Sequence, residues 1–399
     1  MKITDVEVIV LRHPLSRPFG FSQWWFEART CCLVRVATDA GLVGWGEASL
    51  EWKTRAVVGA IGDCEPLVLG LDPRRIEHIY QVLYRHGFFR PGVIGLSAIS
   101  GIEQACWDIF GKSVGLPVYQ LLGGAVRDRV RMYDHLGGGD MRALYLQDEA
   151  KAMADRAREC VAAGYTAIKA LVVPTSEPLE GTKKLRHAET LMAAIRDAVG
   201  PDIDIMIDIH GRTTPEMGIQ YCKVLEPYRP YFVEEPCPPE DTAGLARVTR
   251  ATSVPIATGE RRVTRHEFRP LLEAEACAVI QPDVCHCGGL WELRKIAAMA
   301  EPYHVSVAPH NPLGPIATVA NVHFALATPN WLIQEAIRAD VPWRADVTTE
   351  PIVVKDGYIY PPDRPGLGVE VNEAEAAKHP FRQEVLMTPY HPDGSVADW

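Results

Sequence analysis

The sequence has no excess of basic residues, and this bears on its partners. It contains 51 Asp and Glu against 41 Lys and Arg, so the formal net charge is −10. Proteins that bind nucleic acid or anionic membranes by charge carry a basic surface instead. The composition therefore favours a small molecule over nucleic acid or a membrane as the partner.

Long apolar runs and paired cysteines are also missing. No run reaches the roughly 18 apolar residues of a membrane span, and the opening MKITDVEVIVLRH carries acidic residues where a signal peptide has an apolar core. The ten cysteines are scattered and include no CxxC pair, which argues against a disulfide framework. We expect a cytoplasmic protein without a membrane segment.

The overall composition is that of a folded globular protein. Apolar residues make up 47% and charged residues 23% of the 399 residues, which argues against disorder. A chain of this length holds two ordinary domains or one large barrel with an attachment.

A repeated pattern runs through the second half of the chain. Short β-rich runs each end in an acidic residue or a histidine, and a loop and a helical pattern follow. These ends lie 23 to 27 residues apart, the length of one strand plus one helix. Strand residues two apart share a face, so a buried face turns polar at each end. The terminal residues are Asp208, Glu234, Glu260, Asp283, His310 and Glu335.

The segments between these runs predict helices. Apolar residues from Met217 to Tyr228 follow the i, i+4, i+7 spacing of an amphipathic helix. The segment from Ala188 to Val199 repeats that spacing, and Gly200 supplies a helix stop. Strand and helix therefore alternate.

Two earlier runs, 129–135 and 167–171, bring the predicted strands to eight. Eight strand-helix units predict a (β/α)8 TIM barrel of the α/β class, with an open doubly wound sheet as the alternative. The polar ends favour the barrel, because its strands converge at their carboxyl ends, whereas distant strands of an open sheet share no site.

The chain outside the barrel has a different pattern. Residues 1–125 combine a hairpin, with Gly41 in its TDAG turn, and helical segments, so we predict an α+β capping domain. Residues 126–355 form the predicted catalytic barrel. Residues 356–399 are predicted to return to the capping domain.

Three carboxylates at the ends of consecutive strands predict a metal site. Asp208, Glu234 and Glu260 offer oxygen ligands, which suit a hard cation, and Mg²⁺ fits best because it keeps positions for water and substrate. The alternative is that these acids solvate strand ends or pair with Lys and Arg. Glu235 has the opposite strand parity from Glu234 and is left out of the metal site.

His310 and Asp283 end neighbouring strands and predict a general base. A carboxylate that accepts a hydrogen bond from one imidazole nitrogen leaves the other nitrogen to take a proton. His286 is a rival partner for Asp283, although the nearby Gly288-Gly289 turn favours a loop role. The CHC stretch, Cys285 to Cys287, has too few well-spaced ligands for zinc.

Three further residues have two interpretations each. His210, two residues beyond Asp208, could protonate a leaving group, or it could orient a metal ligand. Lys169 could contact a substrate carboxylate, or it could form a salt bridge to the metal carboxylates. Glu335 could hydrogen-bond a developing enolate if protonated, or it could brace His310.

These residues and their motifs resemble the enolase superfamily, mandelate racemase subgroup, over essentially the whole chain. Within it they are most similar to the D-galactonate dehydratases and related acid-sugar dehydratases. The motifs that carry the resemblance are DIHGR, FVEEP, TGERR, QPDVCHCGG, APHNPLGPIA, QEA, RPGLGVE and DGSVADW.

The resemblance implies an activity and a role for each site residue. It implies Mg²⁺ on the three carboxylates, His310 with Asp283 as the base, His210 as the acid and Glu335 as an enolate contact. The substrate would be an acid sugar, dehydrated at C2 and C3 to a 2-keto-3-deoxy acid. The relatives also imply a homo-oligomer.

Two departures from the relatives bear on the reaction and the substrate. Leu171 stands where many relatives carry a second, basic lysine and where galactonate dehydratases carry Asn, which disfavours a two-base racemase. The segment 13–30 is longer than its counterpart and carries Trp24, Trp25 and Phe26, which either form a lid or pack the cap onto the barrel. An epimerase, racemase or cycloisomerase, and a non-catalytic acid-sugar-binding protein, are the alternatives.

Overall fold

The structure is a computed structural model of the 399-residue chain. It describes residues 1–21, 24–136, 149–173, 176–337, 345–350, 352–383, 385, 388–391 and 393–398, with the side chains of 16–26 and 149 outside the description. The predicted lid residues Trp24, Trp25 and Phe26 therefore lie outside the described side chains. Their backbone pairs with Phe19 to Phe21 across a hairpin.

The amino-terminal part is an antiparallel sheet covered by helices. Strands β1 (Ile3–Phe21), β2 (Trp24–Thr38) and β3 (Val43–Glu47) form the sheet, and Gly41 makes the predicted turn with a φ of 75°. Helices α1 (Thr54–Val68), α2 (Ile76–Arg85) and α3 (Gly92–Val114) follow. A Cβ at Gly46 would lie 1.9 Å from Gly101 O of α3, so glycine allows the helix to pack directly on β3.

Eight parallel strands in the described part of the chain form a closed barrel, as predicted. Each strand pairs with the next, β11 pairs with β4, and Val307 of β10 bridges to Trp331 just before β11. This closure shows that the open doubly wound alternative is wrong. The strands are β4 (Val130–His135), β5 (Ala167–Ala170), β6 (Asp204–Asp208), β7 (Phe232–Glu234), β8 (Ile256–Thr258), β9 (Val279–Ile280), β10 (Ser306–Val307) and β11 (Gln334–Glu335).

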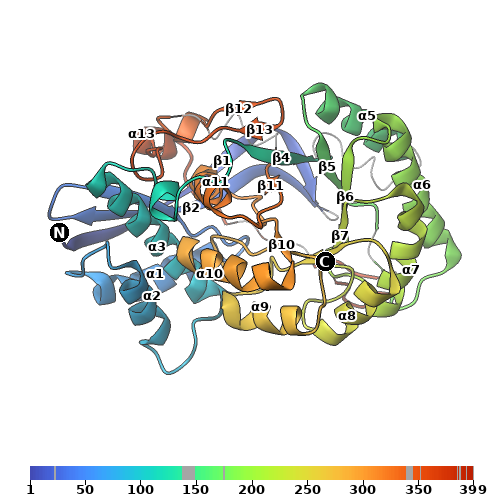
Figure 1. Ribbon diagram of the computed structural model, residues 1–399, viewed down its shortest axis with the longest axis horizontal. Helices are drawn as coiled ribbons and strands as arrows, with labels where there is room; N and C mark the ends of the chain where they lie inside the picture. Colours follow the sequence, from blue (N-terminus) through green and yellow to red (C-terminus); the bar gives the residue numbers. More distant parts are fainter. Residues whose placement is uncertain are drawn as a thin grey trace.

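Helices alternate with the strands and cover the barrel on the outside (Figure 1). The predicted helix after Asp208 begins at Pro215, with the Thr214 side chain accepting a hydrogen bond from Met217 N as its cap. No helix within the described ranges is long and apolar enough to cross a bilayer. The helices are α4 (Val118–Leu121), α5 (Glu149–Ala162), α6 (Thr182–Val199), α7 (Pro215–Leu225), η2 (Glu226–Tyr228), α8 (Thr242–Ala251), α9 (Thr264–Glu273), α10 (Leu290–Ala300), η3 (Glu301–Tyr303) and α11 (Pro315–Ala327).

The segment after β11 contacts both parts of the molecule. It forms β12 (Val354–Lys355), β13 (Tyr358–Ile359) and α13 (Glu373–Ala376), and β13 pairs antiparallel with β4 of the barrel. Farther along this segment, His379 O accepts a hydrogen bond from Arg12 N of β1 at 2.9 Å. The exact limits of the three predicted domains stay a prediction.

A ring of apolar side chains fills the inside of the barrel. Each strand or its immediate flank contributes one buried residue, which is the layered packing expected of a closed eight-stranded barrel. We call this set the apolar ring. Its members are Tyr133, Ala167, Met206, Phe232, Ala257, Val279, Ala308 and Ile333.

Candidate active site

A second ring lies two residues farther along the strands and is polar. Because strand residues two apart point to the same side, these side chains follow the apolar ring toward the carboxyl ends. At β8 this position is Gly259, whose φ is 138°, and the acid comes one residue later. We call this set the polar ring. Its members are His135, Lys169, Asp208, Glu234, Glu260, Gln281, His310 and Glu335.

The polar ring brings the three predicted metal carboxylates into one charged cluster. Asp208 and Glu234 are directly opposite each other in the β6–β7 pair. Burial, with the charge of Asp208 second, raises the pKa of Glu234 to about 7. Burial also raises the pKa of Glu260 well above its usual value, with Glu235 and Glu234 adding to the shift and His310 opposing it. The ionised forms of Glu234 and Glu260 are therefore disfavoured in this cluster.

Lys169 lies among these carboxylates. Its Nζ is 2.9 Å from Glu234 Oε2, 2.9 Å from Glu335 Oε1 and 3.4 Å from Asp208 Oδ2. Burial opposes its charge, but these carboxylates hold the pKa of Lys169 well above its usual value. Of its two sequence interpretations, the salt bridge to the metal carboxylates matches these contacts.

The chemistry of the carboxylates fits a divalent cation. Glu234 Oε1 is buried and accepts no hydrogen bond from the groups that the structure describes, so it keeps free lone pairs. Oxygen-only donors with excess negative charge are the ligand type of hard cations. No group of three His, Cys, Asp or Glu side chains within the described ranges is already gathered in a metal-binding arrangement. Asp208 and Glu234 instead contact Lys169.

His310 and Asp283 form the predicted pair. His310 Nδ1 donates to Asp283 Oδ2 at 2.7 Å, whereas His286 Nε2 is 3.6 Å from the same oxygen. His310 is thus the partner at hydrogen-bond distance, and its Nε2 lies 3.5 Å from Glu260 Oε2. Burial opposes its charge, but Glu260 and Asp283 hold the pKa of His310 well above its usual value.

The placement of this pair differs from the sequence prediction in one respect. Strands β9 and β10 end at Ile280 and Val307, so Asp283 and His310 lie in the following loops rather than at the strand ends. Pro282 and Pro309 precede them and have no N–H to extend the ladder.

His210 is positioned by contacts on both ring nitrogens. Its Nε2 lies 3.0 Å from Asp208 Oδ2, and its Nδ1 lies 2.9 Å from Arg212 Nη2. A guanidinium only donates, so Nδ1 accepts and Nε2 carries the proton of the neutral ring. Burial lowers the pKa of His210 to about 4, and Arg212 adds to this effect while Asp208 opposes it. These contacts match the orienting interpretation, and the acid role requires that His210 first gain a proton.

Glu335 is fixed by three donors. It accepts hydrogen bonds from His135 Nε2 at 2.5 Å and Asn311 N at 2.6 Å, in addition to Lys169. Burial opposes its ionisation, but Lys169 and His135 hold the pKa of Glu335 well below its usual value. An ionised carboxylate has no proton to donate, so this state gives no support to Glu335 as a hydrogen-bond donor to an enolate.

Sequence reasoning missed several residues of this site. His135 follows Tyr133 by two in a predicted strand, so the period-two rule could have found it. Arg261 gave no such signal. Its Nη2 donates to His210 O at 3.0 Å and pairs with Glu235 at 2.5 Å, which is consistent with leaving Glu235 out of the metal ligands. A Cβ at Gly211 would lie 2.1 Å from the same nitrogen.

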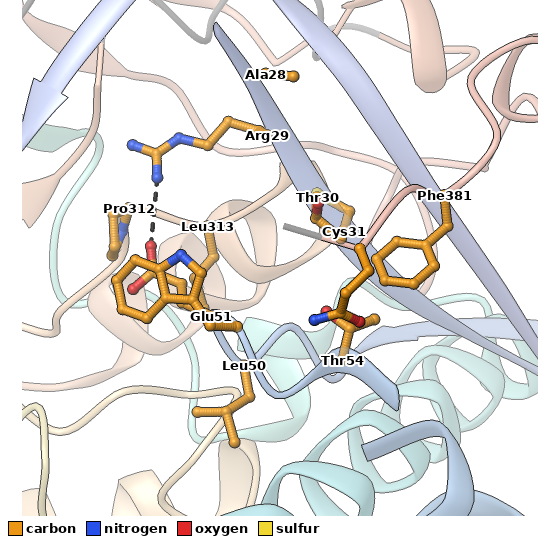
Figure 2. Close-up of a pocket in the computed structure, with 12 residues that line it drawn as sticks. Ala28, Arg29, Thr30, Cys31, Leu50, Glu51, Thr54, Pro312, Leu313 and Phe381 are labelled. Atoms are coloured by element: carbon orange, nitrogen blue, oxygen red, sulfur yellow. Dashed lines mark hydrogen bonds and ion pairs between the residues drawn. The ribbon is translucent and has the colours of Figure 1, made fainter. Parts of the chain in front are cut away.

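A cavity of about 40 Å³ lies between the capping sheet and the loop that follows His310 (Figure 2). Arg29 points toward Glu51 in this view, and Nη1 donates to Oε1 at 3.3 Å. Phe381 of the carboxy-terminal segment closes the other side (Figure 2). Three parts of the chain therefore build this cavity.

Comparisons with known proteins identify the family. Residues 4–123 match the amino-terminal domain of mandelate racemase and muconate lactonizing enzyme, and residues 152–375 match the enolase C-terminal domain-like family. The chain therefore belongs to the mandelate racemase/muconate lactonizing enzyme family of the enolase superfamily, as the motifs predicted.

Individual relatives cover nearly the full chain. D-galactonate dehydratase of Pectobacterium atrosepticum is 39% identical over 374 residues, covering 92% of this chain and 96% of the relative. D-galactonate dehydratase of Ralstonia nicotianae is 39% identical with the same coverage. The crystal structure of a mandelate racemase/muconate lactonizing enzyme from Sulfitobacter sp. has a TM-score of 0.89 at 37% identity and covers 100% of both chains. By relationship, the chain is an enzyme in the class of enolase-superfamily dehydratases.

Proposed function

We propose that this protein is a Mg²⁺-dependent acid-sugar dehydratase. It would remove the C2 proton of a sugar acid and eliminate the 3-hydroxyl to give a 2-keto-3-deoxy acid. The observation that carries this proposal is the polar ring together with His210. The ring holds a cluster of carboxylates and His310, whose imidazole is paired with Asp283, and the imidazole of His210 contacts Asp208 of the ring. Binding alone needs no such acid-base pair.

Asp208, Glu234 and Glu260 would hold the cation. A bound Mg²⁺ would supply positive charge that stabilises the negative charge developing on the substrate carboxylate during proton removal. The raised pKa of Glu234 and the hydrogen-bonding capacity of its Oε1 support this assignment.

His310 would be the base. Asp283 accepts a hydrogen bond from Nδ1–H of His310, which fixes the orientation of the ring. In the neutral imidazole, Nε2 is then free of a proton and can take the C2 proton. Lys169 would keep Glu234 and Glu335 in place through its ion pairs.

His210 would act on the leaving group. Its proton would pass to the 3-hydroxyl as the C3–O bond breaks, so the hydroxyl leaves as water and the electron pair from C2 forms the C2–C3 double bond. The enol then tautomerises to the 2-keto acid. Because the neutral ring contacts Asp208, this role requires that substrate binding bring a proton to His210.

The identity of the sugar acid depends on the rim of the site. The relatives named above act on D-galactonate by name, but the apolar Leu171 follows β5 at the position where the resemblance implies a polar residue. The cavity with Arg29 and Glu51 would receive the distal hydroxyl groups of the substrate, with the indole of Trp52 on its wall. We therefore propose an acid-sugar substrate that differs from D-galactonate in its stereochemistry or length.

The experiment is a substrate panel. Purified protein with Mg²⁺ is incubated with hexonates, pentonates and aldarates, and 2-keto acid formation is followed, with His310→Asn and chelator-treated protein as controls. We expect a single acid or a narrow group of acids to react in the wild type alone. Exchange or inversion at C2 without 2-keto acid would instead show an epimerase, and silence with metal bound would argue against sugar acids. The cytoplasmic location and the homo-oligomer stay predictions.

A further inference from the structure

The loop that carries Asp283 is held by a helix of the capping domain. After β9, residues 281–289 lead into α10 without regular structure. Four side chains on one face of α3 contact this loop and the start of α10 at 2.7 to 3.3 Å. They are Ser97, Ser100, Glu103 and Gln104. The loop of Asp283, the residue paired with His310, is thus supported from another part of the fold.

His286 is the side chain of this loop that faces both α3 and Asp283. Its Nδ1 lies 3.1 Å from Ser97 Oγ, and its Nε2 lies 3.6 Å from Asp283 Oδ2. Ser97 donates its one hydroxyl hydrogen to Val93 O at 2.8 Å, so it can only accept from His286. Nδ1 is therefore the donor of the neutral ring, and Nε2 lies against the Asp283 carboxylate as a packing contact at 3.6 Å rather than as a hydrogen bond.

Both oxygens of the Asp283 carboxylate have contacts with neighbouring groups. Its Oδ1 accepts from Cys285 N at 2.6 Å, and its Oδ2 lies between His310 and His286. The side chain of His286 is 7% exposed, so its contacts are with protein rather than solvent. The His286 ring is therefore one of three groups that limit how the Asp283 carboxylate can turn.

We propose that His286 is a positioning residue of the base pair: Ser97 of the capping helix orients it, and its ring fixes Asp283 against His310. The capping domain would then support the proton-transfer step as well as cover the site. This inference rests on the proposed function, in which His310 removes the C2 proton. Cys285 and Cys287, its neighbours, contact Gln104 Nε2 and Gly289 O instead, so the three residues do not converge on a common metal.

Two substitutions at His286 test separately the contact of its Nδ1 with Ser97 and the contact of its Nε2 with Asp283. His286→Asn places an amide near the position of Nδ1 and keeps the contact with Ser97, but it leaves nothing against Asp283. His286→Gln places an amide near the position of Nε2. We expect His286→Asn to slow C2 proton exchange with solvent deuterium by about 10- to 100-fold at an unchanged KM, and His286→Gln to stay within about fivefold of wild type.

Ser97 and Ser100 provide a matched pair on the same helix. Both hydroxyls donate to a carbonyl four residues earlier, and both accept from the Asp283 loop, but Ser100 accepts from Gly288 N rather than from His286. We expect Ser97→Ala to slow exchange at least about threefold more than Ser100→Ala. Equal exchange rates for the two variants would overturn the proposal that Ser97 orients His286.

A measurement without substrate separates this inference from the proposed function. The proton on His310 Nδ1, which is hydrogen-bonded to Asp283, should give a low-field ¹H NMR resonance, and its loss in His310→Asn would assign it. We expect His286→Asn to shift or broaden it and His286→Gln to restore it. An unchanged resonance and exchange rate in His286→Asn would overturn the proposal. Absence of exchange in the wild type on every acid tested would overturn the proposed function, while the resonance still tests His286.

Discussion

The apolar ring and the polar ring occupy the same strands two residues apart, yet they have opposite energetics. Phe232 and Met206 of the apolar ring are fully buried among other apolar side chains. Glu234 and Asp208, two residues on, are just as buried but carry charge. Burial stabilises the first pair and penalises the second. The apolar ring, which stabilises the barrel, therefore lies directly beneath the polar ring, which holds the candidate active site.

The electrostatics of the polar ring express this difference. Lys169 offsets part of the negative charge through its contacts with Glu234 and Glu335, but the pKa of Glu234 still rises to about 7, because burial and Asp208 disfavour its ionised form. A charge cluster that is unfavourable without a ligand is ready to bind a cation. Each strand thus carries one residue whose burial stabilises the fold and, farther along, a polar residue whose burial costs stability but suits it to bind a ligand.

The largest expected effect is on catalysis in the polar ring. His310→Asn should reduce the rate of 2-keto acid formation by at least about 10³-fold, because the base that removes the C2 proton is lost. The melting temperature should change little. The control is His304→Asn, an exposed histidine with a φ of 57° that Asn tolerates. Activity retained in His310→Asn would show that another group is the base.

In the apolar ring, the same kind of truncation should affect stability. Phe232→Ala should lower the free energy of unfolding by about 3 to 5 kcal/mol, because it leaves a cavity between the strands. Urea unfolding measures this loss. Phe88→Ala, at a phenylalanine that is 95% exposed, is the control and should lie near zero. Similar losses for the two variants would show that the ring is loosely packed.

Glu103, a buried carboxylate outside the polar ring, should make the stability of the protein depend on pH. Glu103 accepts hydrogen bonds from Trp107 Nε1, Leu290 N and Trp291 N, yet burial raises its pKa from 4.5 to about 7. The folded state then binds the proton more tightly than the unfolded state. The stability that Glu103 contributes is therefore greatest below pH 4.5 and falls by about 3 kcal/mol as pH rises to about 7.

Glu103→Gln should remove this dependence. The difference in unfolding free energy between wild type and variant should shrink by about 3 kcal/mol between pH 4.5 and 8, as measured by urea unfolding at each pH. A difference that does not change with pH would mean that the hydrogen bonds keep Glu103 ionised throughout.

A smaller effect of opposite sign is expected for a carboxylate of the polar ring. Without metal, Glu260→Gln should raise the melting temperature by roughly 2 °C, because it removes one carboxyl group from a cluster of like groups. Mg²⁺ should raise the melting temperature of the wild type but not of this variant. Glu240→Gln, at an exposed position, should respond to Mg²⁺ as the wild type does. A stabilisation of Glu260→Gln by Mg²⁺ equal to that of wild type would place the cation elsewhere.

The smallest effect concerns selectivity rather than rate. Leu171 is 9% exposed and lies two residues beyond Lys169, at the rim of the polar ring. Leu171→Asn should change the preference among acid sugars by a few kcal/mol at most, about tenfold to a hundredfold in relative kcat/KM, because one hydrogen-bonding group is added. The panel of sugar acids measures this change, and an unchanged preference would remove Leu171 from the specificity argument.

The barrel and most of the polar ring were predictable because their signals are local. A period of two within a strand and a period of about 25 along the chain placed Asp208, Glu234 and His310. The partners of these residues were not predictable, because they come from distant segments. Ser97 is 189 residues from His286, and Arg261 is 51 residues from His210. Glu260 follows its apolar-ring residue, Ala257, by three positions instead of two, because Gly259 turns the chain.

The most direct test is a crystal structure of His310→Asn with Mg²⁺ and the acid sugar that the panel identifies. The variant would hold the substrate without turning it over. We expect the cation between Asp208, Glu234 and Glu260, with C2 of the substrate facing residue 310 and the 3-hydroxyl facing His210. A cation bound away from these carboxylates, or a substrate with C2 turned away from residue 310, would contradict the account.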